Sequence, residues 1–222
     1  MMGGMQVRVV SAISELRRDA WNALVSYADG DNPSLDWNFV AALEAGGCAT
    51  PAQGWLSCHF VVERGRDLVA VAPAYIKGDS DGDFGRDWDW AAAAARAGFA
   101  YYPKLVVGVP FTPVTGRRIL LSPGLSVPEQ DEIYAQLVPA MERFCRDQGL
   151  GSMHVLFPTG TQADALSRHG LARRVSFQYH WHNPSPGYRD SDAFYARFTS
   201  TRRNALRRER AGEVERSGKT RR

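Results

Sequence analysis

Apolar residues recur along the chain with two different spacings. Alternating apolar and polar positions predict strands, and apolar positions three or four residues apart predict helices. By this criterion strands are predicted at residues 6–10, 58–64, 67–77, 105–109, 117–121, 152–157 and 173–181. Helices are predicted at residues 15–27, 37–45, 88–97, 129–145, 162–169 and 190–200, followed by a strongly basic helix at 202–210.

The order of these elements predicts an α/β (α+β) fold in which helices cover a mixed sheet. Residues 58–64 and 67–77 form a clear hairpin with its turn at Gly65-Arg66. Pro73 lies inside the second run and, because proline lacks a backbone N–H, indicates an edge position or a bulge. Residues 78–86 are interpreted as a solvated turn, since their Asp spacing resembles a calcium loop without the closing Glu.

The net charge of +3 is unevenly distributed. Residues 201–222 carry nine Arg or Lys and three Glu, a local charge of +6, so the preceding 200 residues carry −3. The body of the chain therefore gives no reason to expect nucleic acid along its whole surface. The change in character predicts a first domain at 1–189 and a helical, basic C-terminal segment at 190–222.

The chain carries no sign of a membrane or secretory protein. It has no run approaching the roughly 20 uncharged apolar residues of a membrane helix, and its N-terminus lacks the features of a signal peptide. Cys48, Cys58 and Cys145 are odd in number and widely spaced, which supports neither a disulfide framework nor a zinc knuckle. We therefore expect a cytoplasmic protein with no membrane span and no metal site.

Residues 101–116 are the strongest candidate for a functional surface. Prolines at 103, 110 and 113 fix φ and remove backbone donors, so this block is a rigid, irregular segment around a short strand. Rigid loops at strand ends often form ligand-binding sites. The alternative is a proline-bracketed strand whose tyrosines simply pack. Polar-tipped side chains are concentrated in the block: Tyr101, Tyr102, Lys104, Thr112 and Thr115.

A second candidate is the segment 178–183. On a strand, Gln178, His180 and His182 share one face. Two histidines at this spacing could ligate a metal, but no third ligand is identifiable from spacing. There are two other interpretations. His180 could contact substrate or transfer a proton, or the polar face could be merely structural. His154 ends a buried strand, where a lone histidine is more often a satisfied core residue.

Several common enzyme classes lose support. The sequence contains no GxSxG elbow, P-loop, Rossmann glycine pattern or HExxH. Hydrolases, nucleoside triphosphatases and dehydrogenases are therefore disfavoured.

Five strings of the sequence resemble the FemAB-like group of the GNAT acyltransferase superfamily, whose members are often labelled peptidoglycan biosynthesis or recognition proteins. The match runs in order from about Ser34 to Arg210. The strings are Tyr-Tyr-Pro-Lys at 101–104, Val-Pro-Phe-Thr-Pro-Val-Thr-Gly at 109–116, His-Val-Leu-Phe-Pro at 154–158, Gln-Tyr-His-Trp at 178–181 and Arg-Arg-Asn-Ala-Leu-Arg-Arg-Glu-Arg at 202–210.

The resemblance implies a GNAT-like mixed, mostly antiparallel sheet flanked by helices. It implies an N-acyltransferase acting on peptidoglycan precursors or another amine acceptor, thus on a small-molecule or peptide substrate. The acyl donor would be an aminoacyl-tRNA or an acyl-CoA; the GNAT pyrophosphate loop is absent, and no cofactor is evident. Candidate catalytic residues are His180, Tyr102 and Lys104. Candidate substrate-binding residues are Trp90, Tyr101, Phe111, Thr112, Thr115, His154, Gln178 and Trp181.

One departure from the family pattern changes these expectations. In such proteins the basic helix leads into a second GNAT-like half, whereas here the sequence ends about a dozen residues after it. The chain is thus expected to be truncated after the first half, with 190–222 as the start of the second. Two alternatives to the enzyme stay open: a non-catalytic peptide- or sugar-binding module, and an inactive fragment. The basic helix could contact tRNA or, lacking a packing partner, mediate self-association.

Overall fold

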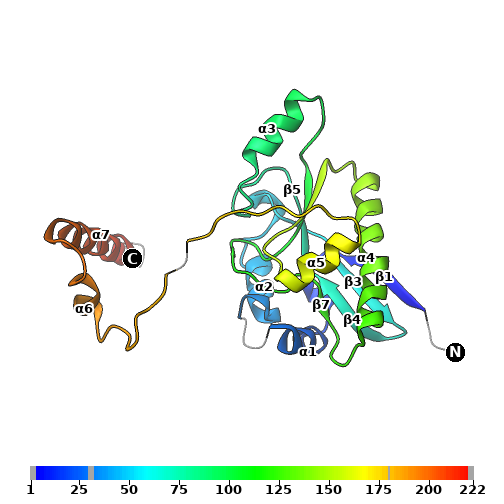
Figure 1. Cartoon of the computed structure of the whole chain (residues 1–222), viewed down its shortest axis with the longest axis horizontal. Coiled ribbons are helices and arrows are strands. Elements are labelled where there is room, and N and C mark those ends of the chain that lie inside the picture. Colours follow the sequence, from blue (N-terminus) through cyan, green and yellow to red (C-terminus); the bar gives the residue numbers. More distant parts are fainter. Residues whose placement is uncertain (1–3, 30–32, 180, 220–222) are drawn as a thin grey trace. The chain divides into compact units, whose positions relative to one another are not determined.

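The computed structural model describes residues 4–29, 33–179 and 181–219. These residues form two compact units, one ending at Arg173 and the other beginning at Arg174 (Figure 1). The first unit contains two sheets with their helices, and the second contains two further helices.

The first unit is built on two four-stranded sheets. One consists of β1 (Met5–Val10), β3 (His59–Arg64), β4 (Asp67–Ala72) and β7 (Leu120–Leu121), antiparallel throughout and ordered β1-β3-β4-β7. The other consists of β2 (Leu56–Ser57), β5 (Ala74–Lys77), β6 (Lys104–Val107) and β8 (Ser152–Val155), ordered β2-β5-β6-β8. Here β2, β5 and β6 pair antiparallel, while β8 runs parallel to β6.

Pro73 divides the predicted strand 67–77 into β4 and β5, which belong to different sheets. Because proline cannot donate a hydrogen bond, the ladder is interrupted at this residue. The carbonyl of Pro73 accepts a hydrogen bond from Gly108 N at 3.0 Å. Neither β4 nor β5 lies at the edge of its sheet, so the edge position predicted from this proline is wrong. The strand is interrupted by a change of sheet, which allows one continuous run of residues to serve both sheets.

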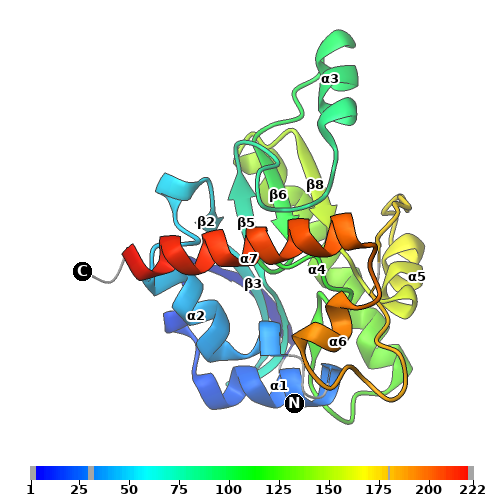
Figure 2. The ribbon, with the colours of Figure 1, turned by 90° about the vertical axis from the view of Figure 1, so that its left-hand side faces the viewer.

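Helices cover both faces of the first unit (Figure 2). α1 (Arg18–Asp29) and α2 (Trp37–Ala45) close one core, where Trp21 and Leu24 pack with Val61. α4 (Val127–Asp147) and α5 (Gly160–Arg168) close the other, where Leu137 packs with Phe60. Successive residues of β3 thus serve opposite cores, which explains why its sequence is apolar without alternation. Three 3-10 turns (Ile13–Glu15, Pro33–Leu35, Pro51–Gln53) and α3 (Trp88–Arg96) complete the unit.

Side chains at the helix starts satisfy backbone N–H groups that have no partner inside the helix. Ser126 and Glu129 form a reciprocal capping box at α4, and Asp36 accepts from Asn38 N at α2. Thr159 accepts from Gln162 N at α5. The helices predicted at 37–45, 88–97, 129–145 and 162–169 are all confirmed, with ends shifted by two residues at most.

The strand predicted at 117–121 is reduced to the two residues of β7. The buried side chain of Gln162 takes the place of a neighbouring strand: its Oε1 accepts from Arg118 N at 2.5 Å and its Nε2 donates to Ile119 O at 2.7 Å. Arg118 is itself buried and donates from Nε to Leu156 O at 2.6 Å. Side chains thus satisfy backbone groups that a longer ladder would otherwise pair.

The second unit consists of α6 (Ser191–Tyr195) and α7 (Ser200–Lys219) with an aromatic cluster. The ring of Phe194 lies at the centre, with centroids 5.2–5.7 Å from its neighbours Trp181, Tyr188, Tyr195 and Phe198. Arg207 on α7 forms an ion pair with Asp192 on α6 at 2.8 Å. The predicted basic helix at 202–210 is confirmed as part of α7.

The strand predicted at 173–181 is wrong over 173–179, which are neither strand nor helix. Val175, Phe177 and Tyr179 are 83%, 91% and 98% exposed. Alternation shows that a segment has one apolar face, but a strand also needs a neighbouring strand to pair with. The mixed, mostly antiparallel fold with flanking helices is nevertheless confirmed.

We expect Gly151→Ala to destabilise the first unit by about 1–3 kcal/mol, as overpacking does. A Cβ at Gly151 would lie 2.4 Å from Ala100 O and 2.8 Å from Tyr101 C, both of them backbone atoms. Gly160→Ala is the matched control, because nothing lies within 4 Å of a Cβ there. Urea unfolding measures both variants. Equal stability of the two would show that the chain before Tyr102 does not constrain β8.

Candidate functional site

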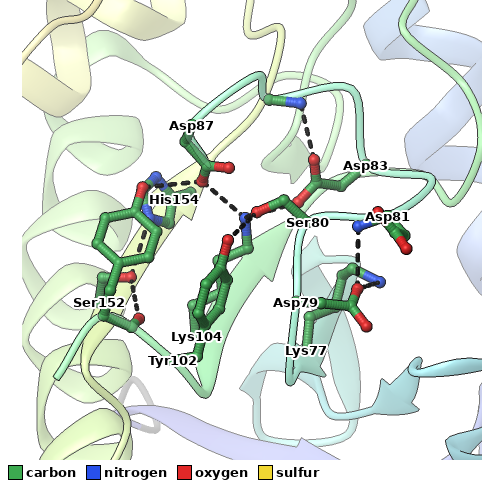
Figure 3. Close-up of polar contacts among 12 residues, drawn as sticks. Lys77, Asp79, Ser80, Asp81, Asp83, Asp87, Tyr102, Lys104, Ser152 and His154 are labelled. Carbon is green, nitrogen blue, oxygen red and sulfur yellow. Dashed lines mark hydrogen bonds and ion pairs between the residues drawn. The ribbon is translucent and has the colours of Figure 1, made fainter. Parts of the chain in front are cut away.

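A buried ammonium group lies at the start of β6. The side chain of Lys104 is fully buried, and its Nζ lies 2.7 Å from Asp83 Oδ2 and 2.7 Å from Asp87 Oδ2 (Figure 3). Nζ also donates to Ser80 Oγ at 2.6 Å. Nζ thus donates hydrogen bonds to Ser80 and Asp87 and forms a close ion pair with Asp83, so three oxygens of the protein surround the charge.

The partners of Lys104 come from the segment between β5 and α3. Ser80, Asp83 and Asp87 are all buried, and Asp83 Oδ1 accepts from Gly85 N at 2.7 Å. Phe84 and Arg86 have φ of 59° and 49°, a left-handed conformation that is uncommon for such residues. The interpretation of residues 78–86 as a solvated turn therefore holds for the exposed Asp79 and Asp81 but is wrong for Asp83, whose carboxylate turns inward to the buried cation.

Two tyrosines extend the cluster from the residues before β6. Tyr101 OH donates to Asp87 Oδ2 at 2.8 Å, and Tyr102 OH lies 2.7 Å from Ser80 Oγ. Their rings meet edge to face with centroids 5.1 Å apart, and both side chains are half-buried. We call Ser80, Asp83, Asp87, Tyr101, Tyr102 and Lys104 the Lys104 cluster.

β8 adds a histidine beside the Lys104 cluster. The His154 ring lies 5.4 Å from the Tyr101 ring, and its Nε2 is 3.0 Å from Ser152 Oγ. Ser152 Oγ in turn donates to the carbonyl of Tyr101 at 2.8 Å. The parallel pairing of β6 with β8 thus places the half-buried His154 against the tyrosine pair.

The charges of the Lys104 cluster do not cancel. Two carboxylates face one ammonium, a formal sum of −1, and the adjacent pair Lys77–Asp79 adds nothing to it. Burial by itself would raise the pKa of Asp87, but hydrogen bonds from Lys104, Ser80 and Tyr101 outweigh it and lower that pKa to about 2. Asp87 therefore stays ionised at neutral pH. Its Oδ1 is buried and has no hydrogen-bond partner within the described part of the chain.

The structure brings together four of the residues predicted for the site: Tyr101, Tyr102, Lys104 and His154. Phe111 lies 5.4 Å from the Trp55 ring with φ of 58° and is 44% exposed. Thr112 Oγ1 donates to Pro110 O at 2.9 Å, and Thr115 is exposed. Trp90 is 60% exposed on α3.

The remaining predicted residues lie elsewhere in the chain. Gln178 and Trp181 belong to the second unit, and His180 lies outside the described residues. The roles predicted for all these positions stay predictions.

Sequence reasoning missed Ser80, Asp83 and Asp87. One signal could have indicated them: the chain has 24 arginines and only three lysines, Lys77, Lys104 and Lys219. Two of the three are buried, where the compact ammonium suits an enclosed site better than the wide guanidinium does. The scarcity of lysine therefore indicates that a buried lysine has acidic partners, although it does not identify which aspartates they are.

The described residues lack both a metal-binding cluster and a helix suited to span a membrane. They contain no group of three or more His, Cys, Asp or Glu side chains placed to hold a metal ion. None of the helices in the same residues is both long and apolar enough to cross a membrane.

We expect Lys104→Met to destabilise the protein by about 3–5 kcal/mol, because it leaves two carboxylates buried without their cation. Lys77→Met is the matched control. Lys77 is also buried, but its carboxylate partner Asp79 is half-exposed, so water can replace the lost partner. We expect a smaller loss there, about 1–2 kcal/mol. Chemical denaturation ranks the two variants, and the reverse ranking would contradict a structural role for the Lys104 cluster.

Asp87 should make stability depend on acid pH. Its pKa falls from 3.8 to about 2 on folding, so its contribution is complete above 3.8 and is lost as the pH falls towards 2. The contribution amounts to about 2 kcal/mol. Urea unfolding between about pH 5 and about pH 2 should therefore be less pH-dependent in Asp87→Asn than in the wild type. The exposed Asp81→Asn is the control and should follow the wild type.

Solved structures with a similar course of the chain are N-acetyltransferases. Aminoglycoside N-acetyltransferase AAC(6')-Iy in complex with CoA is 13% identical, with 83% of this chain and 97% of that chain covered and a TM-score of 0.47. Ribosomal-protein-alanine N-acetyltransferase from Brucella melitensis biovar Abortus 2308 is 9% identical (82% and 100% covered, TM-score 0.44). A GCN5-related N-acetyltransferase from Ralstonia eutropha JMP134 is 13% identical (80% and 99% covered, TM-score 0.44). Likeness of this strength concerns the fold and says nothing about activity.

The family of this chain is identified by a match to a family model, not by these structures. None of the curated proteins compared with the chain matches it. The FemAB-like model, described as peptidoglycan biosynthesis/recognition, matches residues 12–221 and so confirms the resemblance inferred from the sequence. This chain belongs to the FemAB-like family.

Proposed function

We propose that this chain is an N-acyltransferase that transfers an acyl group to an amine on a peptidoglycan precursor. The family match over residues 12–221 carries the proposal, because the family is described by peptidoglycan biosynthesis or recognition. The Lys104 cluster with His154 supports it, since aromatic, hydroxyl and imidazole groups converge there.

Acyl transfer to nitrogen needs a route for one proton. The amine attacks the acyl carbonyl carbon, the bond from that carbon to the oxygen or sulfur of the donor breaks, and the amine loses a proton. We assign that proton to His154. Imidazole titrates near neutral pH, and this ring is half-buried beside Tyr101. The leaving oxygen or sulfur is then protonated, which balances the step.

Lys104 suits a different role from the catalytic one first predicted. Its side chain is fully buried, and its Nζ donates to Ser80 and Asp87 and forms an ion pair with Asp83. An ammonium so enclosed cannot approach an oxyanion without breaking an ion pair, which is costly in a buried site. We therefore propose that Lys104 positions the tyrosine pair instead of touching substrate.

The donor is either an aminoacyl-tRNA or an acyl-CoA. For the first, α7 offers a basic surface with Arg202, Arg203, Arg207, Arg208 and Arg210, and phosphate contacts by arginine would bind tRNA electrostatically. The second is the donor that the resemblance to the GNAT acyltransferase superfamily implies. We also propose a catalytic part for His180, self-association through α7 and a cytoplasmic location.

The test is a transfer assay with the full chain. A peptidoglycan precursor peptide with a free side-chain amine is incubated with either labelled aminoacyl-tRNA or labelled acetyl-CoA, and the labelled peptide is counted. His154→Ala should lower the rate by about 100-fold or more if the imidazole takes the proton. His169→Ala is the matched control: His169 bonds Asp131 at 2.9 Å on the α4 side of the unit.

Three outcomes separate the candidate functions. Transfer that requires His154 and tolerates His169→Ala supports the proposal. Binding of the peptide without transfer from either donor would favour the recognition half of the family description, a non-catalytic module. Neither binding nor transfer would reject both and leave the interpretation as an inactive fragment.

A further inference from the structure

The hydrogen bonds around Ser80 leave the hydroxyl oxygen of Tyr102 able to accept from a ligand. Ser80 Oγ accepts one hydrogen from Lys104 and carries a single hydrogen of its own. In its 2.7 Å contact with Tyr102 OH, either hydroxyl can be the donor. In both arrangements the hydroxyl oxygen of Tyr102 keeps at least one lone pair, with which it can accept a hydrogen bond from a ligand.

The charge beneath the tyrosines has the opposite sign to a ligand ammonium. The Lys104 cluster sums to −1 with its carboxylates ionised, and Asp87 Oδ1 is buried without a hydrogen-bond partner in the part of the chain that the structure describes. A buried charge left uncompensated is costly, so a further cation nearby is favoured. Tyr101 hydrogen-bonds this same carboxylate directly and is itself only half-buried.

The rings themselves are suited to a cation. The Nζ of Lys104 lies 5.5 Å from the Tyr102 ring centroid and 6.0 Å from that of Tyr101. These distances are within the range in which an ammonium is attracted to an aromatic ring. The pair therefore already accommodates one ammonium group, while both side chains remain half-exposed.

We infer that Tyr101 and Tyr102 form a subsite for a primary ammonium group, held by the hydroxyl oxygen of Tyr102, the two rings and the net negative charge of Asp83, Asp87 and Lys104. The inference rests on the proposed function in one respect: the ammonium would be the acceptor amine before it loses a first proton to water, and the neutral amine so formed then attacks the donor and loses its second proton to His154. It adds three residues to the substrate machinery, Ser80, Asp83 and Asp87, which position the hydroxyl and supply the charge.

A pair of probes isolates the charge of the ligand. The first is Nα-acetyl-lysine methylamide, which has a free side-chain ammonium, and the second is its Nε-acetylated, neutral form. The full chain with isotope-labelled tyrosine rings is titrated with each by NMR. We expect the ammonium probe to shift the signals of Tyr101 and Tyr102 and the neutral probe to leave them unchanged. Equal binding of both probes, or binding of neither, would overturn the inference.

Three variants isolate the residues. Tyr102→Phe keeps the ring but removes the accepting oxygen and should weaken binding of the ammonium probe about fivefold, as loss of one hydrogen bond does. Asp87→Asn removes the excess charge and should weaken it at least as much. Tyr179→Phe, at an exposed tyrosine of the second unit, is the matched control and should bind like the wild type. If Asp87→Asn does not fold, Tyr102→Phe alone decides.

The same variants separate this inference from the proposed function. Ammonium binding with these sensitivities but no acyl transfer from either donor leaves the subsite in place and refutes the enzyme. Acyl transfer whose KM for the amine is unchanged in Tyr102→Phe refutes the subsite and leaves the enzyme in place.

Discussion

The ion pairs of Lys104 with Asp83 and Asp87 are the interaction on which the candidate site depends. The segment that carries these aspartates has no regular secondary structure, so no ladder of hydrogen bonds fixes its path. Attraction to a buried cation on β6 fixes it instead. Because Tyr101 and Tyr102 precede the same strand and bond to Asp87 and Ser80, one charge organises the strand, the loop and the aromatic pair. The arrangement is costly to disturb, since each partner would be left charged and buried.

Elements that depend on local pattern could be predicted from the sequence. The helix at 129–145 follows from its apolar spacing, and the interruption at Pro73 follows from a missing N–H. Tyr101, Tyr102 and Lys104 were indicated by their concentration of polar tips within a rigid block, and His154 by the resemblance to a family. All four come together in the structure.

Features that depend on a partner distant in the chain could not be predicted from the sequence. Asp87 looks like any loop aspartate until Lys104, 17 residues away in the chain, is placed beside it. Nothing in the sequence indicates that the side chain of Gln162 bonds the backbone of Arg118 and Ile119, 44 and 43 positions earlier, in place of a neighbouring strand. At 173–179 the opposite error arose, because a clear alternation has no neighbouring strand to make it part of a sheet. Periodicity specifies which face of a segment is apolar, whereas pairing is decided elsewhere in the chain.

The scarcity of lysine has a practical consequence for chemical labelling. The chain has three lysines, and Lys77 and Lys104 are buried in the folded first unit. An amine-reactive reagent reaches these two side chains only when that unit opens, and it has few other amines to consume it. The rate at which Lys104 becomes modified would therefore report the opening of the site itself, without any engineered probe. Arginine, which carries nearly all of the remaining positive charge, does not react with such a reagent.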